Sequence, residues 1–398
     1  MTEGSRLRVA LLTREYPPEV YGGAGVHVEY LARELDRLVE LTVHCFGADR
    51  TGAVAHRPWE ELRANPALEA VSVDLAMAAA VGDAQLVHSH TWYANLAGHL
   101  AKLMYEVPHV ATVHSLEPLR PWKAEQLGGG YAVSSWCERT ALEAADAVIA
   151  VSAEHRRDLL GCYPAVDPER VSVIGNGIDT EEYRPDPGTD LVERNGVDPA
   201  RPYVLFVGRI TRQKGLTFLL DAAPLIESDA QLVICAGAAD TPELAAEIAA
   251  KLEQVEGARG GVVWIERMLG RPELIQLLSH AAVFACPSIY EPLGIVNLEA
   301  MACATAVVAT ATGGIPEVVE DGVTGLLVPF DPVDGPSRTP QDPEAFAGAI
   351  AARVNRLLGD PAEAKRMGEA GRERAVEHFG WDRIAEQVLT LYERLVPA

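Results

Sequence analysis

Short apolar runs alternate with stretches of helically spaced apolar residues along the whole chain. In the first half, the runs predict strands at 7–12, 41–46, 86–88, 109–113, 147–151 and 171–174. The stretches between them predict helices, among them 26–38 and 94–104. Strands that alternate with helices form a parallel sheet covered on both faces, and such sheets bind ligands at the carboxyl ends of their strands. The first half therefore predicts an α/β domain.

The same alternation resumes after a polar, proline-containing interruption at 175–188. The second half predicts strands at 203–207, 231–236, 262–265, 283–285 and 306–309, with helices at 216–226, 243–255, 272–280 and from Gly294 onward. We place a domain boundary at 180, inside the interruption. Two such domains in series predict a cleft between them, lined by strand ends, as the place for a ligand.

Charge and composition narrow the range of partners. The net charge of −23 argues against binding to nucleic acid or to an anionic membrane surface. The chain has no apolar run of the roughly 18 residues that cross a bilayer, and its start lacks the layout of a signal peptide, so we expect a cytoplasmic protein. The six cysteines show no C-x-x-C pair and no zinc spacing, which predicts reduced thiols and no metal. The oligomeric state stays open, a homo-oligomer included.

Two glutamates eight residues apart frame the most informative stretch. Glu291 precedes a Pro-Leu-Gly turn, and the apolar run 295–302 predicts a buried helix that begins near Gly294. Free N–H groups at that helix start would lie beside Glu291, and such a site suits a diphosphate. Glu299 would lie about one and a half turns into the helix, within reach of a ribose diol. The alternative is a core helix with one capping carboxylate.

A basic loop follows the strand predicted at 203–207. Arg209 and Lys214 lie five residues apart in a turn that opens a helix, so both cations can reach one phosphate group. The loop is not a P-loop, because it lacks the G-x-x-x-x-G-K pattern and a hydroxyl after the lysine. A solvated basic loop is the alternative. No Asp-x-Asp pair is present to chelate a metal ion.

Glycines and histidines occupy further loop and strand-end positions. Gly22 and Gly23 precede the helix at 26–38 and can turn N–H groups toward an anion or a sugar hydroxyl, the alternative being a flexible entry loop. His88-Ser89-His90 and His114 follow two predicted strands, and we expect His114 in the site. Structural histidines with satisfied hydrogen bonds are the alternative.

These motifs, taken in their order along the chain, resemble those of the retaining glycosyltransferases of family 4. The match rests on Gly22-Gly23, His114, Gly208-Arg209 with Lys214-Gly215, and Glu291-x7-Glu299 followed by Gly313-Gly314. The resemblance implies the GT-B fold: two Rossmann-like parallel-sheet domains, 1–180 and 181–378, facing each other across a cleft. It also implies that a C-terminal helix in 379–398 packs back on the first domain. A plain helix of the second domain is the alternative.

The family implies a role for each matching residue in transferring glucose from ADP-glucose with retention of the α configuration. Arg209 and Lys214 would hold the diphosphate, and Glu299 the ribose. Glu291 and His114 would lie at the transferred sugar, so the catalytic set is His114, Glu291, Arg209 and Lys214. Other donor contacts would come from Gly22, Gly23, Leu293, Gly294, Ile295 and Met268. The family needs no cofactor and no metal.

A narrower resemblance points to the acceptor. The segments around Arg14 and around Arg120 resemble those of the short actinobacterial-type glycogen synthases, several of which are α-maltose-1-phosphate synthases. Longer bacterial synthases carry an aspartate where this chain has Thr91, and the change removes a negative charge. Arg14, Arg120 and Lys123 add positive charge, which suits glucose 1-phosphate as the acceptor. The implied acceptor residues are Arg14, Glu15, Tyr16, Thr91, Trp92, Arg120 and Lys123.

Other functions remain open at this point. The chain could elongate an α-1,4-glucan directly, or transfer another hexose within the same family. A nucleotide-sugar epimerase would use carboxylates beside the sugar, and a non-catalytic nucleotide-sugar binder would bind ADP without turnover. The loop at 266–269 near the expected base does not distinguish adenine from uracil.

Overall fold

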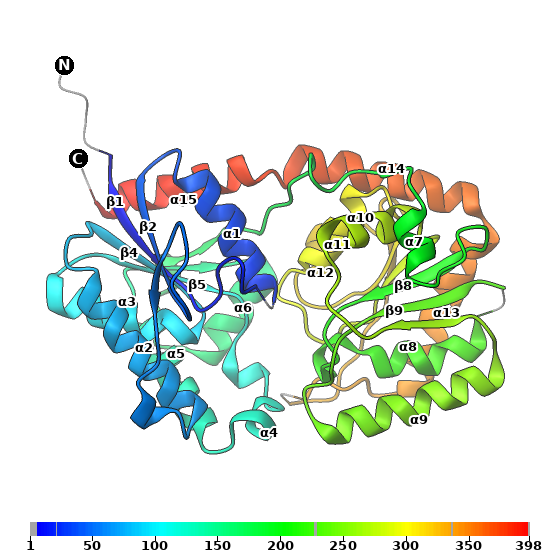
Figure 1. Ribbon diagram of the computed structural model, residues 1–398, viewed down its shortest axis with the longest axis horizontal. Helices are drawn as coiled ribbons and strands as arrows, with labels where there is room; N and C mark the ends of the chain where they lie inside the picture. Colours follow the sequence, from blue (N-terminus) through cyan, green and yellow to red (C-terminus); the bar gives the residue numbers. More distant parts are fainter. Residues whose placement is uncertain (1–5, 21, 227–228, 336, 397–398) are drawn as a thin grey trace. The chain divides into compact units, whose positions relative to one another are not determined.

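The computed structural model describes residues 6–20, 22–226, 229–335 and 337–396 (Figure 1). The chain divides into two compact units. The first unit comprises residues 1–177 together with 381–398, and the second comprises residues 178–380. The two units have the same α/β architecture.

The first unit is built on a parallel sheet of seven strands. In spatial order they are β3 (Val54–His56), β2 (Glu40–Phe46), β1 (Arg8–Leu12), β4 (Leu86–His90), β5 (His109–Val113), β6 (Ala147–Ala150) and β7 (Val171–Val173). The helices are α1 (Gly23–Leu35), α2 (Pro66–Ala80), α3 (Trp92–Tyr105), α4 (Lys123–Leu127), α5 (Gly130–Ala144), α6 (Ala153–Cys162) and α15 (Trp381–Leu395), with 3-10 turns at Glu60–Leu62, Glu117–Leu119 and Pro168–Arg170.

Side-chain alternation along the strands explains why both faces of this sheet are covered. Val9 and Leu11 of β1 pack with α1 and α15, whereas Ala10 and Leu12 pack with α2 and α3. Successive side chains of a strand point to opposite faces, so an uninterrupted apolar strand needs a helix layer on each side. In Figure 1, α15 at the red end of the chain lies beside the blue α1. The last helix thus belongs to the core of the first unit.

The second unit has a parallel sheet of six strands. In spatial order they are β10 (Val262–Ile265), β9 (Gln231–Cys235), β8 (Tyr203–Val207), β11 (Val283–Cys286), β12 (Val307–Thr310) and β13 (Gly325–Val328). The helices are α7 (Asp190–Arg194), α8 (Leu216–Ala222), α9 (Pro242–Ala258), α10 (Arg271–His280), α11 (Ile295–Ala302), α12 (Ile315–Val318), α13 (Pro343–Gly359) and α14 (Pro361–His378), with 3-10 turns at Arg212–Lys214 and Ala223–Leu225.

The strand order of the second unit places two chemistry-bearing loops next to each other. β8 pairs with β11, so the loop after β8 and the loop after β11 leave the sheet at the same edge. The apolar face of this sheet toward α8, α9 and α13 forms one large core cluster. That core fixes the strand ends from which both loops start.

Several elements differ from the sequence-based prediction. Helix α2 and strand β3 were not predicted, and β4 runs on to His90 instead of ending at 88. Asn65 caps α2 and Pro66 is its first residue, but the helix is apolar on most sides, so no single stripe marks it. No helix in the described ranges combines the length and the apolar character that spanning a bilayer requires.

Candidate functional site

In the second unit, a lysine and a glutamate from neighbouring loops meet in an ion pair. Lys214 Nζ lies 2.5 Å from Glu291 Oε2, and Ser288 Oγ donates to the same oxygen at 3.2 Å. The Lys214 side chain is 18% exposed and that of Glu291 is 9% exposed, so the pair is largely shielded from water. Gly215 lets the loops approach, because a Cβ there would lie 2.0 Å from the carbonyl oxygen of Pro287.

A glycine also holds the backbone of Glu291. Gly314 donates its N–H to the Glu291 carbonyl at 2.9 Å. Gly313 adopts a φ of +54°, and a Cβ on it would lie 1.9 Å from the same carbonyl oxygen. The Gly-Gly pair after β12 therefore fixes the position of Glu291 through its main chain.

Helix α11 begins directly after the Glu291 turn. Gly294 is its N-cap residue, with a φ of +97°, and no side chain caps the helix there. The first amides of a helix lack acceptors within it, so those near Ile295 are suited to an anionic ligand. Leu293 is buried at 3% exposure beside this turn. The start of α11 lies where the apolar run in the sequence predicts it.

Glu299 lies inside α11 and is 8% exposed. Burial raises its pKa to about 7, while a hydrogen bond with Tyr183 and the charge of Arg271 oppose that increase. The carboxyl therefore changes its ionisation near neutral pH. Two other predicted donor residues lie on the surface of this unit. Arg209 follows β8 and is partly exposed, and Met268, in the loop after β10, is 66% exposed.

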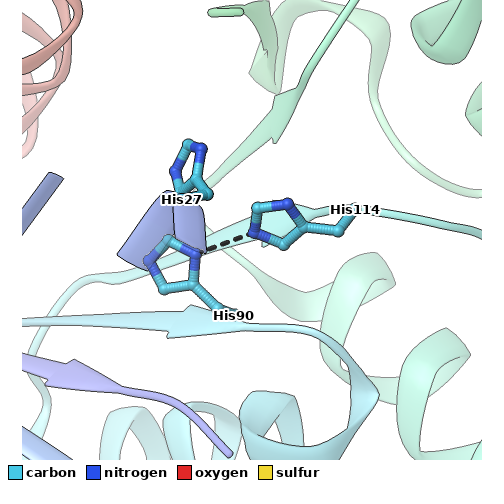
Figure 2. Close-up of side chains that lie close together, drawn as sticks. All are labelled: His27, His90 and His114. Atoms are coloured by element: carbon cyan, nitrogen blue, oxygen red, sulfur yellow. Dashed lines mark hydrogen bonds between the residues drawn. The ribbon is translucent and has the colours of Figure 1, made fainter. Parts of the chain in front are cut away.

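In the first unit, three histidine rings lie together at the strand ends (Figure 2). His90 Nδ1 lies 3.0 Å from His114 Nε2, and the His27 ring centroid lies 4.7 Å from that of His114. His90 ends β4, His114 follows β5, and His27 lies in the first turns of α1. His27 Nδ1 also lies 2.7 Å from Asn176 Oδ1. We call His27, His90 and His114 the histidine cluster.

Burial governs the charge of the histidine cluster. It lowers the pKa of His27 to about 4, and it lowers the pKa of His90 and His114 well below the ordinary value. All three rings are therefore neutral at pH 7. His27 and Asn176 were not predicted from the sequence: His27 lies inside a predicted helix, and Asn176 follows the strand predicted at 171–174 but belongs to no recognised motif.

The N-terminus of α1 carries a carboxylate from its own unit. Gly22 is the N-cap residue, and its N–H donates to Glu15 Oε2 at 2.8 Å. A Cβ on Gly25 would lie 2.6 Å from that oxygen, so a glycine is needed there for this approach. Gly23 is the first residue of the helix. An anion that binds at this helix start would have to displace Glu15 or lie beside it.

Three basic side chains gather around one aromatic ring and one carboxylate. Arg14 Cζ lies 4.1 Å from the centroid of the Tyr93 ring, and Lys123 Nζ lies 5.4 Å from it. Arg120 Nη1 and Lys123 Nζ each lie 4.0 Å from Glu117 Oε1. We call Arg14, Arg120 and Lys123 the cation cluster.

The cation cluster brings three basic side chains together near two acids, Glu117 and Glu15. The side chains of Arg120 and Lys123 are only 11% and 9% exposed, and Glu117 is fully buried. Burial, and then the charge of Glu117, raises the pKa of the nearby Glu138, which favours its protonated form. A partly buried positive excess of this kind favours an anionic ligand.

The remaining predicted acceptor residues lie in different environments. Thr91 is the N-cap residue of α3, with a φ of +64°. Trp92 is 2% exposed, packs in the core and stacks on Tyr93 at 4.0 Å between ring centroids. Tyr16 is part-buried, and its carbonyl accepts from Arg50 at 2.7 Å. Trp92 thus supports Tyr93 from the core side.

Comparison with known proteins gives full-length matches. The model of glycosyltransferase family 4 matches residues 21–182, and that of glycosyl transferases group 1 matches residues 201–356. The chain is 58% identical to an α-maltose-1-phosphate synthase of Mycolicibacterium smegmatis, over 98% of this chain and 100% of the relative. It is 57% identical to an α-maltose-1-phosphate synthase of Mycobacterium tuberculosis, with the same coverage.

A solved structure supports the fold. The sucrose-phosphate synthase of Thermosynechococcus elongatus superposes with a TM-score of 0.77 at 26% sequence identity. The match covers 98% of this chain and 99% of that one. Two parallel-sheet units of this kind make the GT-B fold.

Proposed function

The chain belongs to glycosyltransferase family 4, and we propose that it transfers glucose from ADP-glucose to glucose 1-phosphate, forming α-maltose 1-phosphate with retention of configuration. The names of the full-length relatives support this reaction. The observation that carries the choice of acceptor is the cation cluster, whose positive charge exceeds that of the neighbouring acids.

In this proposal the second unit binds the donor. Lys214 and Arg209 neutralise the diphosphate, the amides of Leu293, Gly294 and Ile295 donate to it, and Met268 lies at the base. Glu299 accepts from the ribose hydroxyls. The burial of the Lys214–Glu291 pair supports these roles, because charges interact more strongly in a site shielded from water than in water itself.

Catalysis in this proposal is electrostatic. Negative charge develops on the phosphate oxygen that leaves the sugar, and Lys214, Arg209 and the amides of α11 stabilise it. Because these groups can supply the charge, the reaction requires no metal. Glu291 and His114 contact the transferred glucose, and Gly22 and Gly23 contribute backbone donors. No carboxylate acts as a nucleophile.

The first unit binds the acceptor in this proposal. Arg120 and Lys123 receive the phosphate of glucose 1-phosphate, and Arg14 completes the cation cluster. Arg120 and Lys123 are largely shielded from water, which gives their contacts more weight than an exposed ion pair would have, whereas Arg14 is exposed. Glu15, Tyr16 and Thr91 supply polar contacts for the sugar ring.

The first test gives the purified protein ADP-glucose or UDP-glucose, each with glucose 1-phosphate or glycogen, and measures nucleotide release and sugar products. We expect ADP release with a disaccharide phosphate, whose anomeric coupling in proton NMR reports an α linkage, at a rate unchanged by EDTA. Nucleotide release only when glycogen is the acceptor would make the protein a chain-elongating synthase and overturn the proposed acceptor.

A double variant and one control variant test the cation cluster. Replacing Arg120 and Lys123 by alanine together should raise the KM for glucose 1-phosphate at least about 10-fold, because each charge-assisted contact to phosphate is worth over 1 kcal/mol. The KM for ADP-glucose should stay within twofold. Arg57→Ala is the matched control, because its side chain is 65% exposed and lies 3.6 Å from Asp49. An unchanged KM for glucose 1-phosphate in the double variant would remove the basis for a phosphorylated acceptor.

A further inference from the structure

The histidine cluster contains a ring nitrogen that takes part in no hydrogen bond and is therefore available to a ligand. One ring nitrogen from each of His27, His90 and His114 lies within 4.8 Å of the other two. Among the described residues, His27 Nε2 is buried and has no hydrogen-bond partner. Buried polar nitrogens are normally paired, so this unpaired nitrogen beside two further imidazoles points to a ligand.

The surroundings of His27 orient it as a ligand. Its Nδ1 lies 2.7 Å from the side-chain oxygen of Asn176, an arrangement in which Nδ1–H donates and the lone pair stays on Nε2. Metal-binding histidines are typically held in this way, with the distal N–H donated to an oxygen acceptor. The ring also lies 5.1 Å from that of Trp381, with the planes at 78°, so packing restricts its rotation.

His90 and His114 can both bind an ion if each ring adopts the tautomer that leaves its facing nitrogen unprotonated. His90 Nδ1 and His114 Nε2 share one proton across 3.0 Å. If His90 carries its proton on Nε2 and His114 carries its proton on Nδ1, both facing lone pairs are free, and neither ring changes its charge. His114 is partly exposed, which gives an ion a route to the cluster.

We propose that His27, His90 and His114 bind one divalent transition metal ion of the zinc class. Three neutral imidazoles with no carboxylate among them suit zinc, cobalt, nickel or copper, and do not suit magnesium or calcium. A tetrahedral ion with Zn–N bonds of about 2.0–2.1 Å holds its nitrogens about 3.3 Å apart. The His90 Nδ1–His114 Nε2 distance of 3.0 Å is close to that value, and the upper limit of 4.8 Å between the ligand nitrogens of the three rings requires a contraction of up to about 1.5 Å.

Occupancy of this site would inhibit the enzyme. This consequence rests on the proposed function, because it requires His114 to contact the transferred glucose. An ion bound to His114 would take the place of the sugar hydroxyl and add positive charge beside it. The ion is therefore an inhibitor of the transfer reaction and not its cofactor, and binding itself does not depend on the reaction.

Cobalt binding tests the site without any assay of activity. The full chain, stripped of metal with EDTA and dialysed, is titrated with Co²⁺ and with Zn²⁺. We expect one equivalent of Co²⁺ to give the intense visible absorption of a four- or five-coordinate ion, and one equivalent of Zn²⁺ to displace it. Absence of this absorption, or the weak spectrum of an octahedral surface ion, would overturn the proposal.

Variants locate the ion. His27→Ala should weaken Co²⁺ binding at least about 100-fold, and Asn176→Leu about 10-fold through loss of the Nδ1 partner. His56→Ala is the matched control, because His56 Nε2 also lies 3.0 Å from His44 Nδ1, but no third metal-binding side chain among the described residues joins that pair. It should leave the Co²⁺ spectrum unchanged. Equal affinities in His27→Ala and the unmodified protein would overturn the proposal even if Asn176→Leu does not fold.

Inhibition gives the second readout. With ADP-glucose and glucose 1-phosphate, Zn²⁺ should inhibit the unmodified protein and the His56→Ala variant at the concentration that displaces Co²⁺. The concentration for half-inhibition should rise at least about 100-fold in His27→Ala, whatever its basal rate. Co²⁺ binding without inhibition would keep the metal site and would contradict the role proposed for His114.

Discussion

Lys214 Nζ lies 2.5 Å from Glu291 Oε2, although the two residues are separated by 77 positions in the chain. The contact exists because β8 and β11 are neighbours in the sheet, which brings the loops after these strands together. It joins the basic loop and the paired-glutamate motif into one site. The charge of each residue is largely balanced by the other, so a change at either one alters the electrostatic field in the proposed donor site.

Lys214→Ala should reduce kcat/KM for ADP-glucose by about 100-fold or more. In the proposed function Lys214 stabilises the leaving diphosphate, so the variant loses that cation, and it leaves Glu291 as a shielded negative charge. Steady-state kinetics with glucose 1-phosphate at saturation measure the effect. Arg212→Ala is the control, since Arg212 pairs with Glu247 at 3.4 Å and its side chain is 44% exposed. A loss of the same size in Arg212→Ala would assign the effect to general surface charge.

Donor affinity should depend on pH through Glu299. Burial raises the pKa of this carboxyl to about 7, so it is mostly protonated at pH 6 and mostly ionised at pH 8. The ionised form accepts hydrogen bonds from ribose hydroxyls more strongly than the protonated form. The affinity for ADP should therefore increase from pH 6 to pH 8 and level off above it. Isothermal titration calorimetry at several pH values across this range measures how the affinity for ADP changes with pH.

Glu299→Gln separates this effect from the titration of other groups. Glutamine does not ionise, so at pH 8 the ADP affinity of the variant should be lower than that of the unmodified protein, and it should keep only the pH dependence that comes from the phosphates of ADP. These phosphates titrate near this range and contribute equally to both proteins, so the difference between the two proteins reports Glu299. An equally steep pH dependence in the variant would show that Glu299 is not the titrating group.

The periodicity of the sequence predicts most of the fold for a physical reason. Strands buried on both faces appear as uninterrupted apolar runs, and β5 and β8 have the predicted bounds, as does α11. Helix α2 was missed because its small apolar residues face α3 and α5 on one side and the sheet on another, which leaves no narrow stripe. Periodicity detects one-sided burial better than burial on several sides.

The sequence could identify strand-end residues of the candidate site, but not which of them meet. His88 and His90 lie on the same face of β4, because they are two residues apart. The structure places His90 beside His114, while His88 is held between Tyr392 and Thr112 at 2.6 and 2.7 Å. The third member of the cluster, His27, comes from α1. Such proximity depends on the tertiary packing of helices on the sheet, which no local pattern encodes.

Tyr93 should tune acceptor affinity through its ring. Arg14 and Lys123 lie over the ring, and a cation–π contact contributes roughly 0.5–1 kcal/mol at a partly exposed site. Tyr93→Leu should therefore raise the KM for glucose 1-phosphate about fivefold, because both cations lose their orientation. Initial rates over a range of glucose 1-phosphate concentrations measure it. Tyr93→Phe keeps the ring and should stay within twofold, so equal effects in the two variants would assign the role to the hydroxyl.

Gly313→Ala should disrupt the donor site through the backbone of Glu291. An added Cβ would lie 1.9 Å from the Glu291 carbonyl oxygen, so this backbone must move and carry the Lys214 ion pair with it. A displacement of about 1 Å in a catalytic group costs on the order of 100-fold in rate. We therefore expect kcat/KM for ADP-glucose to fall by about that factor, together with a lower melting temperature. Gly322→Ala is the matched control, since Gly322 also has a positive φ, +76°, but no heavy atom of the described residues outside its two chain neighbours lies within 4 Å of its Cβ position. That variant should lose about 1 kcal/mol of stability from backbone strain and keep its kinetics within twofold. If both variants showed the same kinetic loss, positive φ alone would explain it, and the contact between Gly313 and Glu291 would have no role in catalysis.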